Sequence, residues 1–236
     1  MTDQTTYDAV WDDVYAQGHY QHAPYDIVVS FIFRNAPKNK VREAIHILEV
    51  GCGTAANLFF AAQHGFSVCG IDAAAPGILK ARQRFQDAGL TGRLEIGDFT
   101  SLPFEEAFFH LVIDRGAITC TSFDGAKACI AEIARVTAPG GRFLFTPYSD
   151  SSSAAASGQR VDAGGGVPGG LRTGITEGPL VGLGQIRFYS LSDIGALLSE
   201  REWNILEVKH SESFDLLSPL RFIHAAYQVV VERKQP

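Results

Sequence analysis

The sequence predicts a doubly wound α/β fold, built on one mostly parallel, seven-stranded sheet with an antiparallel last strand. Up to about residue 150, short apolar runs alternate with longer amphipathic stretches, which is the pattern of parallel strands joined by helices. The end of the chain adds two strand-like runs with only a loop between them. A chain of 236 residues with 46% hydrophobic residues can form one sizeable core. We therefore expect a single domain over residues 1–236.

The predicted strands are short apolar runs bounded by turn residues. The first five alternate with helical stretches and are expected to lie parallel to one another. The last two pair antiparallel if they are neighbours, because the loop between them is too short for a crossover. The predicted strands are Ile45–Val50, Ser67–Ile71, Leu94–Ile96, Leu111–Ile113, Arg142–Phe145, 203–211 and 222–234.

Helices are expected between these strands. One begins near Pro76, a residue favoured in the first helical turn, and ends before Gly89, which suits a helix end. Another contains Cys129 and is expected to stop at the Pro-Gly-Gly of residues 139–141. A third helix precedes the last two strands and has Ser192 as its expected N-cap.

Two segments lie outside this alternation. Residues 1–40 contain two amphipathic stretches, 7–16 and 25–35, and are expected to form an N-terminal helical cap of lids or edge helices. Residues 149–184 are rich in Gly, Ser and Ala. A structureless loop of that length inside a compact domain is usually a functional lid or a linker. We expect this insertion to be an active-site lid or a dimer contact.

The composition excludes several classes of protein. The chain has 20 basic and 26 acidic residues, a formal net charge of −6 and a pI of about 5.6. Nucleic-acid binding is not expected, because neutralising phosphates requires an excess of Lys and Arg. The start does not resemble a signal peptide and the apolar runs are short, so we expect a cytoplasmic protein without membrane contact. The four cysteines lack ligand-like spacing, which favours reduced thiols.

The segment ILEVGCGTAAN, residues 47–57, carries the strongest functional signal. It places a strand, a glycine-containing turn and a helix start in the order that a nucleotide-type ligand site needs. Gly51 and Gly53, with Cys52 between them, allow a sharp turn and a close approach of ligand to backbone. The helix that follows offers unpaired N–H groups to an anion. The same turn without any ligand is the alternative.

Acidic residues accompany the first three predicted strands at the same edge of the sheet. Glu49 lies just before the first glycine, and Asp72 follows the second strand, where a carboxylate can accept two hydrogen bonds from a ribose. Asp98 follows the third strand beside Phe99, a pair suited to an amine next to an aromatic face. One such carboxylate is more often a helix cap. Three at one edge favour a ligand that crosses it.

With these motifs the chain resembles the class I S-adenosylmethionine-dependent methyltransferases over residues 45–148, and the tail 190–234 agrees with that family's last helix and strands. The resemblance implies a Rossmann-like methyltransferase fold and S-adenosyl-L-methionine as cofactor, with S-adenosyl-L-homocysteine as product. It implies that the segment 49–53 surrounds the methionine part, that Asp72 holds the ribose, and that Asp98 and Phe99 flank the adenine.

Two other functions are weighed against this one. An NAD-dependent oxidoreductase is disfavoured because Ala56 stands where its third glycine belongs and no second domain follows. A module that binds the cofactor without turnover stays open.

Residues after the fourth predicted strand are expected to meet the acceptor. The string IDRGAI, residues 113–118, resembles the equivalent turn of thiopurine-type methyltransferases, which makes Asp114 and Arg115 candidate catalytic neighbours and Asp114 also a cofactor contact. An Asp–Arg ion pair that closes the turn is the alternative. Thr146-Pro147-Tyr148 offers no further metal ligands, so no metal is expected.

The N-terminal segment supplies further candidates. Trp11 and Tyr15 are four residues apart on one helical face, and their WDxxY pattern resembles family members in which such residues close over the cofactor. His19 and Tyr20 follow in a loop, where a histidine can act as a base if its pKa is near neutral. We expect a small-molecule acceptor, with a sugar-like or amino-sugar compound favoured over a heterocyclic or toxic one, and a monomer or homodimer.

Overall fold

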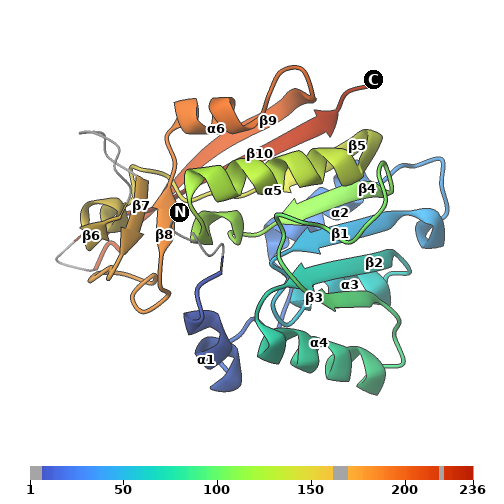
Figure 1. Ribbon diagram of the computed structural model, residues 1–236, viewed down its shortest axis with the longest axis horizontal. Coiled ribbons are helices and arrows are strands. Elements are labelled where there is room, and N and C mark those ends of the chain that lie inside the picture. Colours follow the sequence, from blue (N-terminus) through green and yellow to red (C-terminus); the bar gives the residue numbers. More distant parts are fainter. Residues whose placement is uncertain (1–6, 162–169, 218–220, 236) are drawn as a thin grey trace.

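The computed structural model describes residues 7–161, 170–217 and 221–235, and its centre is a seven-stranded sheet (Figure 1). The strand order is β3-β2-β1-β4-β5-β10-β9, and β10 runs antiparallel to both of its neighbours. The order reverses between β1 and β4, as in doubly wound folds. The predicted fold class is confirmed. The strands are β1 (His46–Val50), β2 (Ser67–Asp72), β3 (Arg93–Ile96), β4 (Phe109–Asp114), β5 (Thr137–Phe145), β9 (Trp203–Ser213) and β10 (His224–Arg233).

Helices cover both faces of this sheet (Figure 1). Successive strand residues point to opposite faces, so Ile47 packs in one apolar cluster and Leu48 in the other. Helices α2, α3 and α4 bury their apolar residues in the first cluster, and α5 and α6 do so in the second. The helices are α1 (Val10–Ala16), α2 (Asp26–Asn35), α3 (Ala56–Gln63), α4 (Ala75–Asp87), α5 (Phe123–Val136) and α6 (Leu191–Leu197). None of the helices described is long and apolar enough to span a membrane.

Helix α2 differs from the expected lid or edge helix. Its Val28, Phe31 and Ile32 are at most 2% exposed and belong to the same apolar cluster as α3 and α4. Helix α2 is therefore part of the layer that covers the sheet, whereas α1, the other helix described in the N-terminal segment, packs against α4.

Two element boundaries differ from the predicted ones. Helix α5 ends at Val136, and the Pro-Gly-Gly of residues 139–141 lies inside β5. Proline disfavours the helical conformation of the residue before it, which stops the helix earlier. Helix α6 is capped by Ser190 rather than Ser192: the Ser190 hydroxyl accepts the Asp193 N–H at 3.1 Å, and the Asp193 carboxylate accepts the Ser190 N–H at 2.8 Å.

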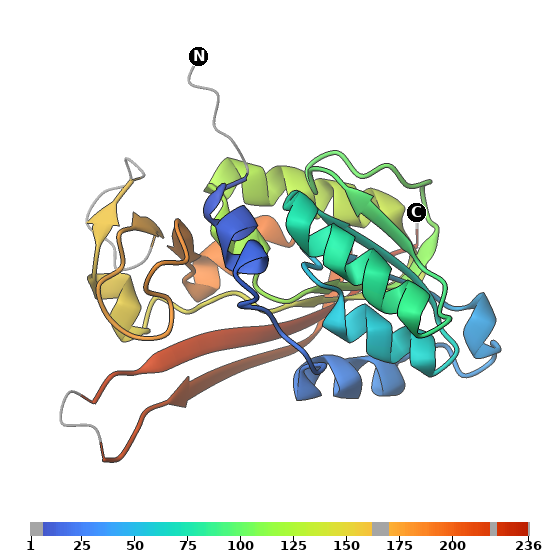
Figure 2. The same ribbon diagram turned by 90° about the horizontal axis from the view of Figure 1, so that it is seen from below.

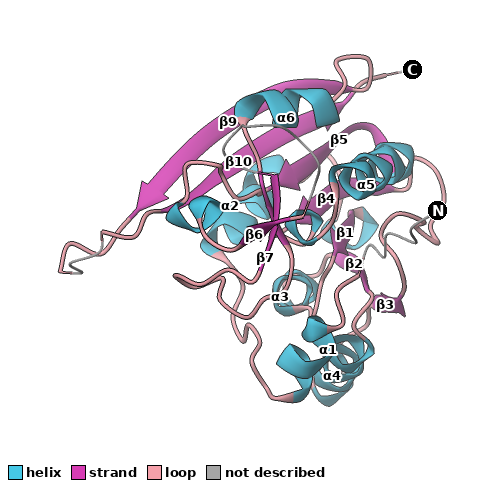
Figure 3. Ribbon diagram, turned by 60° about the vertical axis from the view of Figure 1, so that its left-hand side comes forward, coloured by secondary structure: helices cyan, strands magenta, loops and turns pink. Residues whose placement is uncertain are grey.

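The insertion of residues 149–184 is not a structureless loop in its described part. Helix η3 (Ser153–Ala156) leads into β6 (Gln159–Arg160) and β7 (Gly170–Thr173), which are labelled in Figure 3. Together with β8 (Ile186–Phe188) they form a three-stranded antiparallel sheet (Figure 1). Residues 162–169 lie outside the described part. A third apolar cluster holds this unit together, and its buried members are Ala154, Ala155, Ile175, Leu180, Ile186 and Phe188.

Strands β9 and β10 form a long hairpin that continues past the other strands of the sheet (Figure 2). Strand β9 is the edge of the main sheet and is mostly exposed after its first residue, the buried Trp203. Strand β10 instead lies between β5 and β9, with Val229 and Val231 fully buried. The last strand of the chain is therefore an interior strand of the sheet.

Candidate active site

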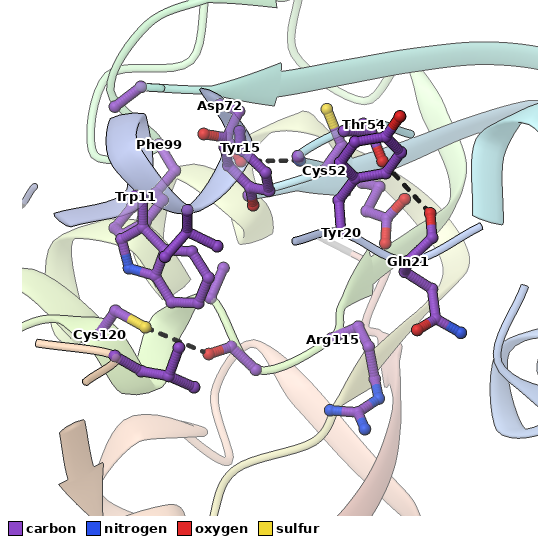
Figure 4. Close-up of a pocket in the computed structure, with 18 of the residues that line it drawn as sticks. Trp11, Tyr15, Tyr20, Gln21, Cys52, Thr54, Asp72, Phe99, Arg115 and Cys120 are labelled. Carbon is purple, nitrogen blue, oxygen red and sulfur yellow. Dashed lines mark hydrogen bonds between the residues drawn. The ribbon is translucent and has the colours of Figure 1, made fainter. Parts of the chain in front are cut away.

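A cavity of about 370 Å³ opens at the carboxyl ends of β1, β2 and β4 (Figure 4). This is the point where the strand order reverses, and doubly wound folds bind ligands there. The sheet supplies the residues around the glycine turn and at the strand ends. Helix α1 and the loop after it add Trp11, Tyr15, His19 and Tyr20, and the insertion side adds Leu183 and Ile186.

The glycine turn has the backbone conformation that requires glycine. Gly51 and Gly53 have φ angles of +62° and +53°. A Cβ on Gly51 would collide with the Ala117 Cβ, and a Cβ on Gly53 would lie 2.5 Å from the Tyr15 hydroxyl oxygen. Other residues therefore cannot replace these glycines without moving the two segments that cover the turn.

Gly51→Ala should lower stability more than an alanine at another glycine with a similar φ. Gly89 has a φ of +65° and open space where the alanine methyl group would lie, so Gly89→Ala should cost only the left-handed backbone, about 1–2 kcal/mol. Gly51→Ala adds the clash with Ala117, about 1–3 kcal/mol more. Urea unfolding of both variants measures the difference, and equal losses would contradict the close packing described here.

Asp72 joins the glycine turn to the end of β2. Its carboxylate accepts the Gly53 N–H at 2.7 Å and the Ala74 N–H at 2.8 Å, and the residue is 8% exposed. Burial raises the pKa of Asp72, and the two N–H donors oppose that rise. This carboxylate lies at the cavity with its position fixed by the backbone on both sides (Figure 4).

Asp98 and Phe99 lie in the loop after β3, two and three residues beyond its end at Ile96, and both line the cavity. Asp98 is exposed, and one of its oxygens accepts the Thr100 N–H and hydroxyl, each at 2.8 Å. Phe99 packs partly against the core. The structure thus brings Asp98 and Phe99 to the same cavity as Asp72.

Glu49 is a buried carboxylate with one unused oxygen. The residue is 3% exposed, and its Oε1 accepts the Asn57 side-chain amide at 2.6 Å. Its Oε2 is buried and has no hydrogen-bond partner among the described residues. Burial, with smaller contributions from Asp114 and Asp72, raises the pKa of Glu49 to about 8. A positively charged group in the cavity would find an unpaired acceptor here.

The residues just before α1 and just after the insertion meet beside the cavity. The Trp11 and Tyr15 rings lie side by side with centroids 5.9 Å apart, and both line the cavity (Figure 4). The Asp8 carboxylate accepts the Gln185 N–H at 3.0 Å, and the Gln185 side-chain amide donates to the Cys120 carbonyl at 2.8 Å. Segments far apart in the sequence therefore form one roof.

The loop after α1 also reaches the cavity. His19 and Tyr20 both line it. The Tyr20 ring is 4.7 Å from the His22 ring between centroids, and the Lys80 ammonium lies 5.0 Å from the Tyr20 centroid. The structure places both predicted residues at the cavity without assigning either of them a chemical role.

Asp114 does not face the cavity, which corrects the predicted role of this residue as an acceptor or cofactor contact. It is 0% exposed, and its two oxygens face the Gly116 and Ile118 N–H groups at 3.3 Å and 2.9 Å. Burial raises the pKa of Asp114 to about 6, against these donors. Its carboxylate shapes the turn after β4, a local function that spacing alone does not distinguish from a catalytic one.

Arg115, the next residue, does line the cavity. Its guanidinium carbon lies 4.0 Å from the centroid of the Tyr25 ring. In the part of the chain that the structure describes, the predicted alternative of an ion pair with Asp114 does not form.

Sequence reasoning missed several residues of the cavity. Tyr25 precedes α2 and donates its N–H to the Asn57 side chain at 3.0 Å, while Asn57 supports Glu49. Tyr148 and Cys120 also line the cavity. Asn57 is the last residue of the segment 47–57. Its position one turn into the helix after the glycines was a signal from which its contact with Glu49 could have been predicted. Nothing in the sequence around Tyr148 indicates a ligand contact.

The sheet order and the position of the glycine turn define the class I methyltransferase fold. Residues 47–141 match a family model described as a methyltransferase domain. A methyltransferase of Burkholderia thailandensis, the 1,6-didemethyltoxoflavin-N1-methyltransferase, superposes with a TM-score of 0.67 and 16% identity, over 100% of this chain and 92% of that one. That structure holds 1,6-didemethyltoxoflavin and S-adenosylhomocysteine.

Two curated relatives match shorter segments. An uncharacterised protein of Haemophilus influenzae is 32% identical over 102 residues, which are 42% of this chain and 40% of that protein. The phthiotriol/phenolphthiotriol dimycocerosates methyltransferase 1 of Mycobacterium ulcerans is 32% identical over 111 residues, which are 46% of this chain and 40% of that protein. The matches thus span less than half of each relative. They agree with the predicted family over the central segment, where residues 47–141 are similar to methyltransferase domains.

Proposed function

We propose that this chain transfers a methyl group from S-adenosylmethionine to a small-molecule acceptor. The observation that carries the proposal is the convergence of Glu49, the glycine turn, Asp72 and Asp98 on one cavity at the switch point of the sheet. The family match and the S-adenosylhomocysteine in the structurally similar Burkholderia enzyme support the same conclusion.

The residues present fit this cofactor. The unpartnered Oε2 of Glu49 suits the ammonium of the methionine part, because a buried carboxylate oxygen needs a donor. Asp72 would hold the ribose hydroxyls, and Asp98 with Phe99 would flank the adenine. When bound, the cofactor supplies an activated methyl group on a positively charged sulfur.

The chain contributes position and exclusion of water rather than an identified base. Orienting two reactants in line can lower a barrier by roughly 7–11 kcal/mol. The roof of Trp11 and Tyr15, tied down through Asp8 and Gln185, would keep water from the reacting atoms. His19 and Tyr20 stay candidates for the proton acceptor, because they line the cavity beside this roof.

The cavity favours a small acceptor with a flat ring. Aromatic side chains make up much of its wall: Tyr7, Trp11, Tyr15, Tyr20, Tyr25, Phe99 and Tyr148. Such walls bind heterocycles by stacking, and they also pack against the apolar faces of sugars. The sugar-like acceptor therefore stays a proposal, and the wall gives more support to the heterocyclic alternative.

Calorimetry and a transfer assay test the proposal together. S-adenosylhomocysteine should bind to the protein, whereas NAD should not. Radiolabelled S-adenosylmethionine should then transfer its methyl group to at least one member of a panel of heterocycles, sugars and amino sugars. Binding without transfer to a broad panel would favour the non-catalytic module, and no binding of S-adenosylhomocysteine would refute both.

A further inference from the structure

Resting on this proposed function, we propose that Arg115 selects acceptors that carry an oxyanion, a carboxylate or phosphate group, attached to a ring. Arg115 would then be a specificity-determining residue, and the acceptor class would be a small anionic ring compound. The proposal rests on the charges in the cavity wall, on the surroundings of the Arg115 guanidinium and on its position relative to the cofactor-binding residues.

The wall of the cavity contains one Lys or Arg side chain among the described residues, Arg115, and four carboxylates. Three of those carboxylates accept hydrogen bonds from backbone N–H groups. Asp8 accepts the N–H of Gln185, Asp72 accepts those of Gly53 and Ala74, and Asp98 accepts that of Thr100. The fourth, Glu49, holds Asn57. None of the four is within 4.0 Å of the Arg115 nitrogens in the described part of the chain.

Aromatic neighbours orient the Arg115 side chain. The Tyr25 ring lies against its guanidinium at 4.0 Å, and such stacking holds an arginine while leaving the N–H groups at its edge available. The Tyr148 hydroxyl is a second neighbour: burial raises the pKa of Tyr148, and the Arg115 charge and a hydrogen bond from the Arg115 side chain partly offset that rise, which leaves the other guanidinium N–H groups for a ligand. A partly buried guanidinium held in this way is suited to a planar oxyanion, which it can bind with two parallel hydrogen bonds.

Arg115 lies on the side of the cavity opposite Asp72 and Phe99 (Figure 4). Asp72 is the last residue of β2 and Phe99 follows β3, whereas Arg115 follows β4. The methionine carboxylate of the cofactor is the competing anion. The N-terminus of α3, directly after the glycine turn, offers N–H groups to that carboxylate, which leaves Arg115 for the acceptor.

Binding of three simple probes to the protein saturated with S-adenosylhomocysteine tests this proposal. Benzoate and phenyl phosphate carry the two oxyanions on a ring, and benzamide is the neutral match for benzoate. Calorimetry should show that benzoate or phenyl phosphate binds at least about tenfold more tightly than benzamide, the scale of one hydrogen bond to a charged group. Whichever of the two binds more tightly identifies the oxyanion.

Arg115→Gln should abolish this preference while changing the affinity for S-adenosylhomocysteine by less than about threefold. Arg201→Gln removes the same charge from an exposed position and should keep the preference. Equal binding of all three probes to the native protein, or no binding of any, would overturn the proposal. A loss of cofactor affinity in Arg115→Gln equal to the loss of probe affinity would instead assign Arg115 to the methionine carboxylate. If the native protein does not bind S-adenosylhomocysteine, the proposed function itself fails.

Discussion

Asp72→Asn should weaken the binding of S-adenosylhomocysteine by about ten- to 150-fold. That range corresponds to about 1.5–3 kcal/mol, the contribution of a hydrogen bond to a charged group. Asparagine keeps the size of the side chain but offers one acceptor oxygen in place of two. Because Asp72 already accepts two backbone N–H groups, the variant would also leave one of them without its partner. Calorimetry well below the melting temperature gives the affinity.

The control for this experiment is Asp87→Asn. Asp87 is exposed at the end of α4, where it accepts a hydrogen bond from Gln83, and it does not line the cavity. Removing its charge should leave the affinity for S-adenosylhomocysteine unchanged. An unchanged affinity in Asp72→Asn as well would refute the assignment of Asp72 to the ribose.

The native protein should bind S-adenosylhomocysteine about 25-fold more tightly at pH 8.5 than at pH 6.5. The pKa of Glu49 is raised to about 8, so at pH 6.5 this carboxyl is mostly protonated and cannot pair with the ligand's ammonium. Affinity should fall about tenfold per pH unit well below the pKa and level off above it. Calorimetry across this range measures the slope.

Glu49→Gln should remove this pH dependence and bind weakly throughout. Glutamine keeps an oxygen for the Asn57 amide but lacks the negative charge. Protein stability supplies an independent readout. The folded native protein holds a proton on Glu49 between the ordinary pKa of 4.5 and about 8, so this residue makes the ligand-free protein less stable as the pH rises through that window. Glu49→Gln should lack that contribution, and a variant with the same pH profile as the native protein would contradict the assignment.

The main sheet was predictable because its strands are apolar over several successive residues and are separated by helical periodicity. The glycine turn was predictable because this position allows no other residue type. A side chain at Gly51 or Gly53 would collide with Ala117 or Tyr15, so the sequence must carry glycine there. The folded structure of the insertion was not predictable, because its small core contains alanines instead of larger apolar residues at positions 154 and 155. Ala154 and Ala155 are buried as fully as larger residues, yet in the sequence they resemble a flexible linker.

In the candidate site, the position of a carboxylate at a strand end does not tell whether its side chain faces the cavity. Asp72 and Asp114 both end strands at the same edge, yet Asp72 lines the cavity and Asp114 turns inward to two backbone N–H groups. The difference comes from the tight turn at Gly116, which a pattern of residue types does not specify. Tyr25 and Tyr148 reach the cavity through tertiary packing, and no local signal marks them.

The interior position of β10 has a consequence for synthesis on the ribosome. Strands β1 to β5 leave the exit tunnel first and can pair with one another, but the outer edge of β5 has no partner until residues 224–233 emerge. Until then the nascent chain exposes a row of unpaired backbone groups beside Phe143 and Phe145. Chains that stall or are cut before β10 would therefore be prone to aggregate even though most of the domain is present.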